Sequence, residues 1–447
     1  MMNELPKGWI ECQLDEIFSI KKKKGIQNNT PYLEIGDINI NTKNYSLKDK
    51  PSVKGCKKAS KDDVVISRVR PTRGAISLIK ENELDVSSAF TVVCNEHKLN
   101  QRLLFYYLAW NDSFLNMLGE NCTGTLYPTV NEEFISTYKI LLPPLNEQHR
   151  IVAKLDKILS KVVTAKVRLD TIPQTLKRFR QSVLSAAVSG ELTKDWSAKN
   201  NINQEWKKVV LSEVAISRLG KMLDKAKNHG EKTKYLRNIN VRWFSFDLND
   251  LAELRITSIE KETLDIKNGD LLVCEGGEPG RCAVWENGKT NFTFQKAIHR
   301  VRLNKNVVSK WLAFNLKKDA DSQRLEDYFT GTTIKHLTGQ SIKTYSFSLP
   351  PLKEQTEIVR RVEQLFKFAD QIEARYNKAK QYTDKLTQSI LAKAFRGELV
   401  PQDPNDEPAE ILLQKINAEK IYSTHLSKKM EISSDNHKSK VKSFRRK

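Results

Sequence analysis

Apolar side chains recur at alternating spacings of four and three residues along two stretches of the chain, each preceded by a Pro-Pro pair. This spacing lines the apolar residues along one narrow face of an α-helix and is typical of a coiled-coil seam. It predicts two long helices, within residues 143–192 and 350–399, each with roughly 40 helical residues and so about 60 Å long at a rise of about 1.5 Å per residue. The predicted seam residues are Ile151, Leu155, Ile158, Val162, Leu169, Ile172, Leu176, Phe179 and Val183 in the first helix, and Ile358, Val362, Leu365, Ile372, Tyr376, Leu386 and Ile390 in the second.

The two helical stretches belong to an internal repeat of the sequence. Residues 123–192 align with residues 330–399 without a gap, at a constant offset of 207, and 23 of the 70 aligned residues are identical. The shared motifs are Thr-Gly-Thr, Leu-Pro-Pro-Leu-x-Glu-Gln and Gly-Glu-Leu, and a weaker match at Trp9 and Trp206 marks the start of each copy. One fold is therefore used twice, which predicts a pseudo-two-fold internal repeat.

The segment before each long helix has the pattern of a mixed α/β globular domain. Short runs of β-branched and other apolar residues predict strands, and longer amphipathic runs predict short helices. Strands are predicted at residues 63–66, 89–94, 270–274 and 292–302, and helices at residues 103–110 and 311–316. The first domain is predicted to span residues 1–142 and the second residues 206–349, with a linker at residues 193–205.

A narrow apolar seam requires one partner helix, and we favour the other copy of the repeat in an antiparallel coiled coil. The alternatives are parallel pairing, packing of each helix on its own domain, and packing on another subunit. Pro173 lies inside the first series and predicts a kink in that helix. After the second helix, residues 400–423 predict a short helical extension, and the basic residues 424–447 predict a disordered tail.

Composition restricts the class of protein. The 447 residues include 75 Lys and Arg against 54 Asp and Glu, a formal net charge of +21, which favours a polyanionic partner such as nucleic acid. The sequence has no long apolar run, so we expect no membrane-spanning helix. It also has no N-terminal signal pattern, so we do not expect a secreted protein. Six cysteines without metal-ligand spacing favour a reducing, cytoplasmic setting.

The positive charge is unevenly distributed along the chain. The net charge is +2 over residues 1–142, +8 over residues 206–350 and +6 over residues 424–447. Basic side chains suit phosphate contact, and arginine and asparagine can also recognise base edges. The candidate DNA-contacting residues are Lys22, Lys23, Lys24, Arg68, Arg70 and Arg73 in the first domain, Lys234, Arg237, Asn238, Arg242, Arg281 and Lys335 in the second, and Thr125 and Thr332 after the repeated glycine, where a purely structural turn is an equal alternative.

No constellation of catalytic or metal-ligating residues emerges from the sequence, so neither an enzyme activity nor a metal site is predicted for this chain. Residues 283–290 match a relaxed phosphate-binding loop, but a strand pattern follows instead of the helix that such a loop needs. A hairpin turn at residues 286–289 is the simpler interpretation. The loop at residues 275–280 is glycine-rich and acidic, which predicts a tight turn that could also accept a hydrogen bond from a cytosine amine.

Two variable domains, each followed by Pro-Pro-Leu-x-Glu-Gln and a long helix that ends in Gly-Glu-Leu, resemble the specificity (S) subunits of type I restriction–modification enzymes. The helical residues 176–184, 354–366 and 386–399 are similar to the conserved helical regions of that family. The similarity is specific in the helices and loose in the globular domains, as expected where each member recognises a different DNA sequence.

This resemblance implies a division of labour. Each globular region would be a target recognition domain that reads one half of an asymmetric bipartite site in double-stranded DNA, and the paired helices would set the gap between the halves. The S subunit would be non-catalytic and would bind no cofactor. It would dock two modification subunits, which bind S-adenosylmethionine and methylate adenine, and restriction subunits would add an ATP- and Mg-dependent nuclease.

Two alternatives from other classes remain open at the level of sequence. The first is a stand-alone two-domain DNA-binding repressor or architectural protein that acts without large partners. The second is a nuclease or nucleotide hydrolase that uses residues 283–290. Stable association with a methyltransferase would separate the specificity subunit from the first alternative, and a substitution of Lys289 would test the second.

Overall fold

The computed structural model describes residues 5–25, 31–48, 50–95, 99–202, 204–224, 226, 228–288 and 290–422. The predicted tail at residues 424–447 lies outside the described residues. The chain divides into two compact units, Met1–Leu169 with Ala379–Lys447, and Asp170–Lys378. The first unit holds the N-terminal globular domain, called domain 1 below, and the second holds domain 2. Each unit also includes parts of the long helices.

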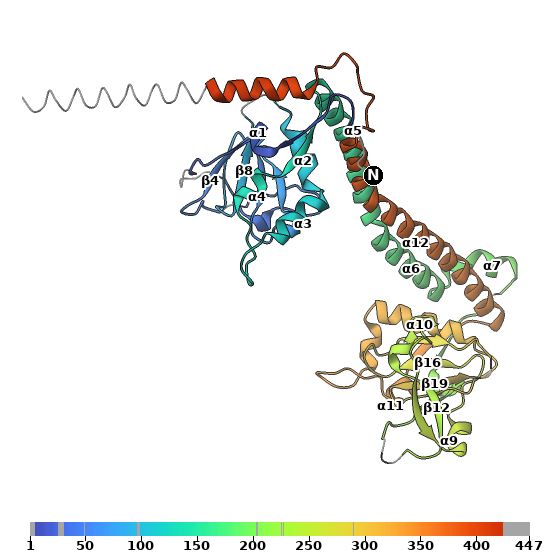
Figure 1. The fold of residues 1–447 in the computed structure, drawn as a ribbon. Helices are drawn as coiled ribbons and strands as arrows, with labels where there is room; N and C mark the ends of the chain where they lie inside the picture. Colours follow the sequence, from blue (N-terminus) through green and yellow to red (C-terminus); the bar gives the residue numbers. More distant parts are fainter. Residues whose placement is uncertain are drawn as a thin grey trace, which may run out of the picture. The chain divides into compact units, whose positions relative to one another are not determined.

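Domain 1 contains two small sheets, with helices packed on one of them (Figure 1). The four-stranded antiparallel sheet has the order β2-β8-β5-β6, and the three-stranded sheet has the order β3-β7-β4 with β3 and β7 parallel. A separate antiparallel pair, β1 with β9, joins the start of the domain to its end. The strands are β1 (Ile10–Gln13), β2 (Ser19–Ile20), β3 (Tyr32–Leu33), β4 (Lys57–Ser60), β5 (Val64–Ser67), β6 (Ile76–Leu78), β7 (Glu83–Val86), β8 (Phe90–Cys94) and β9 (Lys139–Leu142), and the helices are α1 (Leu14–Ile17), α2 (Gln101–Ala109), α3 (Asp112–Glu120), α4 (Glu132–Ser136) and the 3-10 turns η1 (Ile35–Asp37) and η2 (Pro71–Arg73).

Strand β5 explains how the two sheets of domain 1 share one core. Successive side chains of a strand point to opposite faces, and every residue of β5 is buried. Val64 and Ile66 pack in the cluster that contains α2 and α3, whereas Val65 packs in the cluster beneath the three-stranded sheet. A strand covered on both faces has a continuous apolar run, which is the pattern that predicts a strand at residues 63–66.

Domain 2 repeats this plan with matching strands. Its four-stranded antiparallel sheet has the order β11-β19-β16-β17, and its three-stranded sheet has the order β15-β12-β18 with β12 and β18 parallel. The pair β10 with β20 joins the two ends of the domain. The strands are β10 (Lys207–Val210), β11 (Ala215–Leu219), β12 (Glu231–Leu236), β13 (Val241–Arg242), β14 (Ser245–Phe246), β15 (Ala252–Ile256), β16 (Leu271–Cys274), β17 (Cys282–Val284), β18 (Thr293–Phe294), β19 (Ile298–Leu303) and β20 (Ser346–Leu349), and the helices are α8 (Leu211–Val214), α9 (Ser258–Thr263), α10 (Ser309–Asp321), α11 (Gly339–Lys343) and the 3-10 turns η4 (Asn238–Asn240) and η5 (Arg324–Tyr328).

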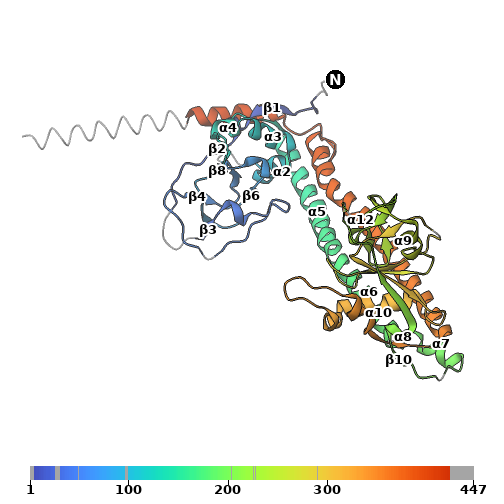
Figure 2. The same ribbon diagram turned by 90° about the horizontal axis from the view of Figure 1, so that it is seen from below.

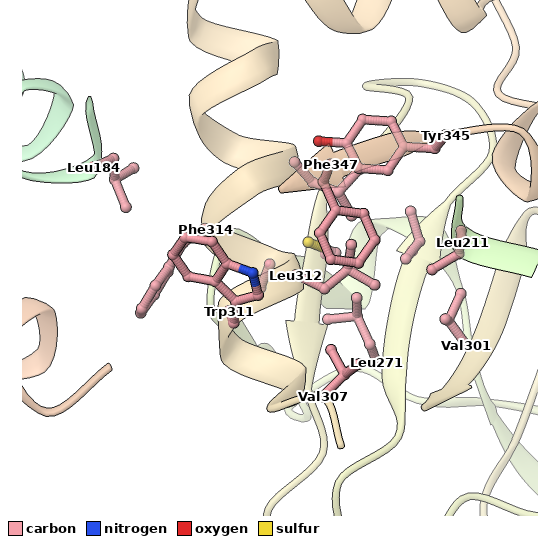
Figure 3. Close-up of a cluster of buried hydrophobic side chains, with 14 of the residues drawn as sticks. Leu184, Leu211, Leu271, Val301, Val307, Trp311, Leu312, Phe314, Tyr345 and Phe347 are labelled. Carbon is pink, nitrogen blue, oxygen red and sulfur yellow. The ribbon is translucent and has the colours of Figure 1, made fainter. Parts of the chain in front are cut away.

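The core of domain 2 lies between its four-stranded sheet and α10. Trp311 of α10 is fully buried in a cluster that also holds Leu271 of β16 and Val301 of β19 (Figure 3). Tyr345, just before β20, and Phe347 in β20 complete the cluster. Burial of these apolar side chains is the main stabilising term for a domain of this size.

One predicted strand is wrong in extent. Residues 292–302 were expected to form a single strand, but they form two strands in different sheets, β18 and β19. The chain turns between them, because the Ile298 amide donates to the Gln295 carbonyl at 3.0 Å while the Gln295 amide donates to Leu236. The apolar pattern alone contains no signal for this turn.

The first long helical stretch is divided and the second is continuous. The first contains α5 (Leu145–Asp170) and α6 (Ile172–Val188), which separate at Thr171, two residues before Pro173. Proline lacks an amide donor and is tolerated in the first turn of a helix, so it begins α6 instead of continuing α5. The second stretch is the single helix α12 (Leu352–Phe395), which has Lys380 at the matching position.

Within each unit, α12 packs against the helix of the other copy. In the first unit, α5 and the last turns of α12 share a buried cluster that includes Leu155, Val162 and Ile390. In the second unit, α6 shares a cluster with the first turns of α12, and Arg180 bonds both Asp370 and Glu373 at 2.7 Å. All the predicted seam residues are buried or partly buried.

The chain beyond α12 returns to domain 1. Residues 409–422 are helical, and Ala409 and Ile416 are buried in the same cluster as α1 (Figure 2). The Lys420 ammonium donates to the carbonyl oxygens of Asp15 and Glu16 at the end of α1. After Gly190, the first copy instead continues into η3 (Glu191–Thr193) and α7 (Lys194–Lys199). Among the helices in the described part of the chain, none is both long enough and apolar enough to cross a membrane.

Candidate nucleic-acid interface

The repeated Pro-Pro-Leu-x-Glu-Gln motif fixes each long helix to its domain. The Gln148 side-chain amide donates to the Pro143 carbonyl at 2.9 Å, and the Gln355 amide donates to Pro350 at 2.8 Å. The glutamate before each glutamine accepts the indole N–H of the tryptophan at the start of the domain, and the distance is 3.0 Å for both Trp9–Glu147 and Trp206–Glu354. Each of these groups would lose a partner if its counterpart changed, so the motif has a structural role.

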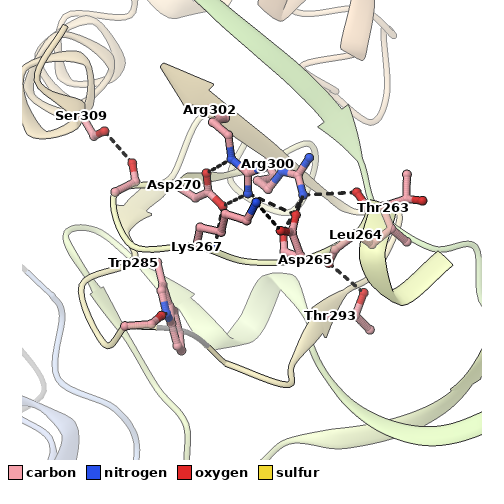
Figure 4. Close-up of polar contacts among 12 residues, drawn as sticks. Thr263, Leu264, Asp265, Lys267, Asp270, Trp285, Thr293, Arg300, Arg302 and Ser309 are labelled. Carbon is pink, nitrogen blue, oxygen red and sulfur yellow. Dashed lines mark hydrogen bonds and ion pairs between the residues drawn. The ribbon is translucent and has the colours of Figure 1, made fainter. Parts of the chain in front are cut away.

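A second matched contact fixes the start of the central strand in each domain. The carboxylate of Asp63 accepts the Ser60 amide at 2.7 Å, and that of Asp270 accepts the Lys267 amide at 2.7 Å. The cation that neutralises the aspartate differs between the domains, since Lys21 bonds Asp63 at 2.9 Å and Arg302 bonds Asp270 at 2.7 Å. Figure 4 shows the larger network of domain 2, in which Arg300 and Arg302 also reach Asp265.

The loops that leave these matched strands have opposite charge. In domain 1, the loop at residues 68–74 (loop 1) contains Arg68, Arg70 and Arg73. In domain 2, the matching loop at residues 275–281 (loop 2) contains Glu275, Glu278 and a single arginine. Two surfaces with the same frame and opposite charge are suited to different base sequences, because arginine recognises guanine while glutamate accepts from cytosine.

Loop 1 holds its arginines in three different environments. Arg70 has left-handed backbone geometry (φ 47°), its amide donates to Pro128 at 2.7 Å and its guanidinium lies 5.2 Å from the centre of the Tyr127 ring. Arg68 donates to the Ser88 carbonyl at 2.7 Å and faces Glu132 at 3.8 Å. Arg73 is exposed in η2. Arg73 is therefore the member of the predicted trio most accessible to a phosphate.

Loop 2 uses its charged side chains to pack against a neighbouring turn. Arg281 is only 14% exposed, donates to the Asn238 carbonyl at 2.8 Å and pairs with Glu278 at 2.9 Å. Glu278 also accepts the indole N–H of Trp243 at 2.6 Å. The structure thus brings the predicted residues Asn238 and Arg281 together, but Arg281 supports the loop and offers little surface to a ligand.

The other predicted residues of domain 2 do not form one cluster. Arg237 donates to the side-chain carboxylate of Asp250 at 2.6 Å and to its backbone carbonyl at 3.0 Å. The guanidinium of the exposed Arg242 lies 3.9 Å from the carboxylate of Asp247. Lys335 forms an ion pair with Glu326 of η5. The remaining candidates are exposed, namely Lys22, Lys23 and Lys24 after β2, Lys234 on β12, and Thr125 and Thr332 on the repeated turns.

A buried lysine, Lys43, holds the end of loop 1 through a hydrogen bond. The Lys43 ammonium donates to the Gly74 carbonyl at 2.7 Å and lies 5.8 Å from the centre of the Trp110 ring. Burial lowers the pKa of Lys43 from 10.5 to about 8, against the smaller opposing effect of Asp112. Lys43 is therefore a structural cation at the end of loop 1, and the charge pattern of the sequence gives no sign of it because Lys43 stands apart from the basic clusters.

Exposed apolar residues beside the loops were missing from the predicted set. Leu126 and Tyr127 follow the first Thr-Gly-Thr motif, and Ile334 follows the second. The available signal was an apolar residue in an otherwise polar turn, at positions that match in the repeat. Trp243, which stands beside Arg242 in the sequence, is a further missed neighbour of loop 2.

Among the residues that the structure describes, no group of three or more histidine, cysteine or acidic side chains is arranged to hold a metal ion. The segment at residues 283–290 is followed by strand β18, so a helix N-terminus that could bind phosphate does not follow it. Cys12, Cys56, Cys122, Cys274 and Cys282 are free thiols.

Comparison with known proteins decides the family. The family model "Type I restriction modification DNA specificity domain" matches residues 6–174 and again residues 203–381. This chain belongs to the type I restriction–modification DNA specificity family. Two matches, one in each half, agree with the internal repeat of this specificity-family protein.

Relatives of the specificity-family protein match it along most of its length. It is 29% identical to the EcoKI specificity subunit of Escherichia coli strain K12 over 450 residues, which cover 94% of this chain and 97% of the relative. It is 32% identical to the EcoBI specificity subunit of Escherichia coli, with 73% of each chain covered.

Solved structures share the fold of the specificity-family protein. An HsdS subunit from Thermoanaerobacter tengcongensis has a TM-score of 0.62 at 21% identity, covering 89% of this chain and 99% of that chain. A chain from a study of type I R-M complex assembly and conformational transition has a TM-score of 0.67 at 20% identity, covering 89% and 100%. The two-domain, mixed α/β architecture is therefore that of specificity subunits.

Proposed function

We propose that this protein is the DNA-recognition subunit of a type I restriction–modification complex and that its two domains are target recognition domains, each reading one half of an asymmetric bipartite site. One observation carries the proposal: the domains share their frame contacts at matching positions, while loop 1 is basic and loop 2 is acidic. A homodimer presents the same surface twice and reads a palindrome, whereas two different surfaces in one chain suit a site with unlike halves.

The long helices are the proposed spacer between the half-sites. The ion pairs of Arg180 with Asp370 and Glu373, and the bond from Arg361 to the Leu192 carbonyl, support an antiparallel direction in the second unit, because one residue number rises as the other falls. In the first unit, the ion pair of Lys166 with Asp384 joins α5 to α12. A coiled coil of fixed length would hold a fixed gap, with pairing along the seam residues predicted from the heptads.

Catalysis is assigned to partner subunits. In this proposal the chain itself is non-catalytic and binds no cofactor, and it docks two modification subunits that carry S-adenosylmethionine and methylate adenine. Restriction subunits add the ATP- and Mg-dependent nuclease. Methylation requires the target base to leave the stack, so a recognition subunit must hold the duplex while its partner reaches the base.

Base-resolution methylation mapping tests the function. Cells that express this chain with its modification subunit should contain methyladenine at a split motif with a non-specific gap. Exchange of residues 206–349 for the matching domain of another specificity subunit should change one half of the motif and leave the other half and the gap unchanged. A change in both halves would contradict the two-reader proposal.

Copurification provides the control for the class of protein. The tagged chain should carry its modification subunit through size-exclusion chromatography at physiological salt. A chain that binds DNA specifically but remains free of partner subunits would instead support a stand-alone repressor or architectural protein.

A further inference from the structure

Both domains carry the same hairpin beside their reading loops. Hairpin 1 (residues 123–129) closes where Thr123 and Thr129 exchange two backbone hydrogen bonds of 2.9 Å, and hairpin 2 (residues 330–336) closes where Thr330 and His336 do the same at 2.9 Å. The threonine hydroxyl adds a bond across each closing pair, at 3.4 and 3.3 Å. The geometry is therefore matched although only the Thr-Gly-Thr part of the sequence is identical.

The repeated glycine permits this turn. Gly124 has a φ of +87° and Gly331 a φ of +89°, a region that residues with a side chain rarely adopt. At Gly331 an added Cβ would also lie 2.3 Å from the Ile334 carbonyl oxygen. The turn, and with it the position of the residues at its tip, is thus specified by the sequence in both domains.

Each hairpin presents an apolar side chain to solvent. Leu126 is 73% and Tyr127 64% exposed in hairpin 1, and Ile334, which aligns with Tyr127 in the repeat, is 67% exposed in hairpin 2. In Figure 1 the teal segment after α3 and the orange segment before α11 each extend away from the body of their own domain. Single exposed apolar residues are ordinary on protein surfaces, but the same exposure at matched tips in two domains calls for a shared cause.

The hairpins touch the loops that differ. In domain 1, the Arg70 amide donates to Pro128 at 2.7 Å and the Val130 amide donates to the Arg68 carbonyl at 3.0 Å. In domain 2, the Leu337 amide donates to the Glu275 carbonyl at 2.8 Å. A ligand seated on either loop therefore also meets the neighbouring hairpin, and the unlike loops leave the hairpin as the feature common to both surfaces.

A feature shared by two readers of unlike sequences cannot carry their difference in specificity. We propose that the two hairpins are sequence-independent wedges, whose apolar tips enter the groove of the duplex and whose Thr125 and Thr332 hydroxyls donate to phosphates. This inference rests on the proposed DNA-recognition function. Apolar side chains that enter a groove partly unstack neighbouring base pairs and bend the duplex, which would favour removal of a base by the partner subunit.

Charge beside the tips agrees with DNA as the occupant. The Arg70 guanidinium lies over the ring of Tyr127 and donates to the Leu126 carbonyl at 3.2 Å, so a cation sits at the base of tip 1. Lys335 is the neighbour of Ile334 at the tip of hairpin 2; it is exposed, and its ammonium is paired with Glu326. An apolar wedge flanked by cations is the arrangement of groove-inserting proteins.

The test uses the complete complex with its modification subunits and two tip variants, Leu126→Ser with Tyr127→Ser in hairpin 1, and Ile334→Ser in hairpin 2. The matched control is Ile259→Ser, which removes an equally exposed (76%) apolar side chain from α9, drawn apart from hairpin 2 in Figures 1 and 2. The probes are a duplex with the mapped bipartite motif and one without it, each with 2-aminopurine beside the half-sites to report unstacking.

Each tip variant should lower affinity for both duplexes by about tenfold, leave the ratio of the two affinities unchanged and reduce the 2-aminopurine signal, while the control behaves as wild type. Three results would overturn the inference: a changed ratio, which makes the hairpin a sequence reader; loss of copurified modification subunit, which makes it a protein-docking site; or unchanged binding. A wild-type complex that fails to prefer the motif would contradict the proposed function itself, and that arm is independent of the variants.

Discussion

The junctions between domain and long helix share the same Trp–Glu hydrogen bond in the two halves, but the remaining hydrogen bonds of the glutamate differ. Glu354 accepts hydrogen bonds from Trp206, Thr193 and Ser197, at 3.0, 3.1 and 2.8 Å. Glu147 accepts the matching bond from Trp9, but its second carboxylate oxygen is buried without a hydrogen-bond partner among the described residues. Burial raises the pKa of Glu147.

The difference arises from the segment that comes after the helix packed on each junction. In the second unit, η3 and α7 supply the two hydroxyl groups that complete Glu354. In the first unit, the chain after α12 supplies Asp406, which bonds Arg150 instead. A repeat thus preserves the contact that defines the junction, while each copy satisfies the remaining polar groups with whatever its own neighbouring segment offers.

The largest expected difference between matched positions of the two halves lies at the two glutamates. Glu354→Gln places an amide donor against at least one of three existing donors, and should lower the free energy of unfolding by about 2 kcal/mol. Glu147→Gln keeps the acceptor for Trp9 and removes a poorly solvated charge, so it should change stability by less than about 1 kcal/mol. Urea denaturation measures the totals, and hydrogen exchange in β10 and β1 locates the losses. Equal losses at both sites would show that the junctions are equivalent.

The raised pKa of Glu147 predicts the direction in which the stability difference between wild type and Glu147→Gln changes with pH. A carboxyl group whose pKa is raised on folding stabilises the fold below its unfolded pKa, and this contribution is lost as pH rises through the folded value. Glu147→Gln should therefore be relatively more favourable at pH 7 than at pH 4. Thermal denaturation of wild type and variant across that range checks the direction.

The second effect concerns Lys43 beneath loop 1. Its pKa of about 8 lies below the ordinary 10.5, so the unfolded chain binds more protons than the folded chain between these two pH values. The free energy of unfolding should rise with pH in this interval, by about 1 to 2 kcal/mol after allowance for solvent. Lys43→Met should abolish the rise, whereas the exposed control Lys22→Met should keep it. A pH profile unchanged by Lys43→Met would show that Lys43 does not carry this effect.

A smaller effect tests the unlike charge of the loops. Arg73→Gln removes an exposed cation from loop 1, and it should weaken DNA binding about threefold and lower the slope of log K against log salt by about 0.9, the value for one phosphate. Arg281→Gln in loop 2 should leave that slope unchanged, because the Arg281 guanidinium is bonded to the Asn238 carbonyl and to Glu278. A reduced slope for the loop 2 variant would mean that Arg281 leaves its intramolecular partners when DNA binds.

The smallest expected effect lies on the helices. Arg180→Ala breaks two ion pairs whose acidic partners are largely exposed, so it should cost no more than about 0.5 kcal/mol. Leu155→Ala, at a fully buried seam position in the other unit, should cost about 3 kcal/mol. Denaturation of the full chain compares them. A larger loss for Arg180→Ala would indicate that charge, not the apolar seam, holds the helices.

The sequence was most informative where contacts demand particular residue types. Trp9 with Glu147 and Trp206 with Glu354 need an indole and an acid, and the turn at residues 330–336 needs Gly331, so these features persist as a detectable repeat. The seam was visible because burial along one face imposes a period. Both signals arise from constraints that act locally or at fixed spacing.

The DNA-reading surface was less predictable, because the sequence does not show which group in the fold a charged side chain pairs with. Arg73 and Arg281 are both arginines in matching loops. Arg73 is exposed, whereas Arg281 donates to the Asn238 carbonyl. Lys335 appeared free in the sequence, whereas Glu326 pairs with it. The apolar character of Tyr127 would ordinarily place it in a core, so the sequence did not reveal that it is exposed on hairpin 1. Such distinctions depend on contacts between distant segments.

The division of the chain into units has a consequence for its synthesis. Domain 2 and its helices lie within a single continuous stretch that ends at Lys378, so every contact of that unit becomes possible as soon as this stretch has left the ribosome. Domain 1 is made first but keeps an apolar face open until Ala409 and Ile416 arrive, about 270 residues after β9 ends at Leu142. The first domain to be translated is therefore the last to be completed, and at about 5 to 20 residues per second this face stays uncovered for roughly 13 seconds or more.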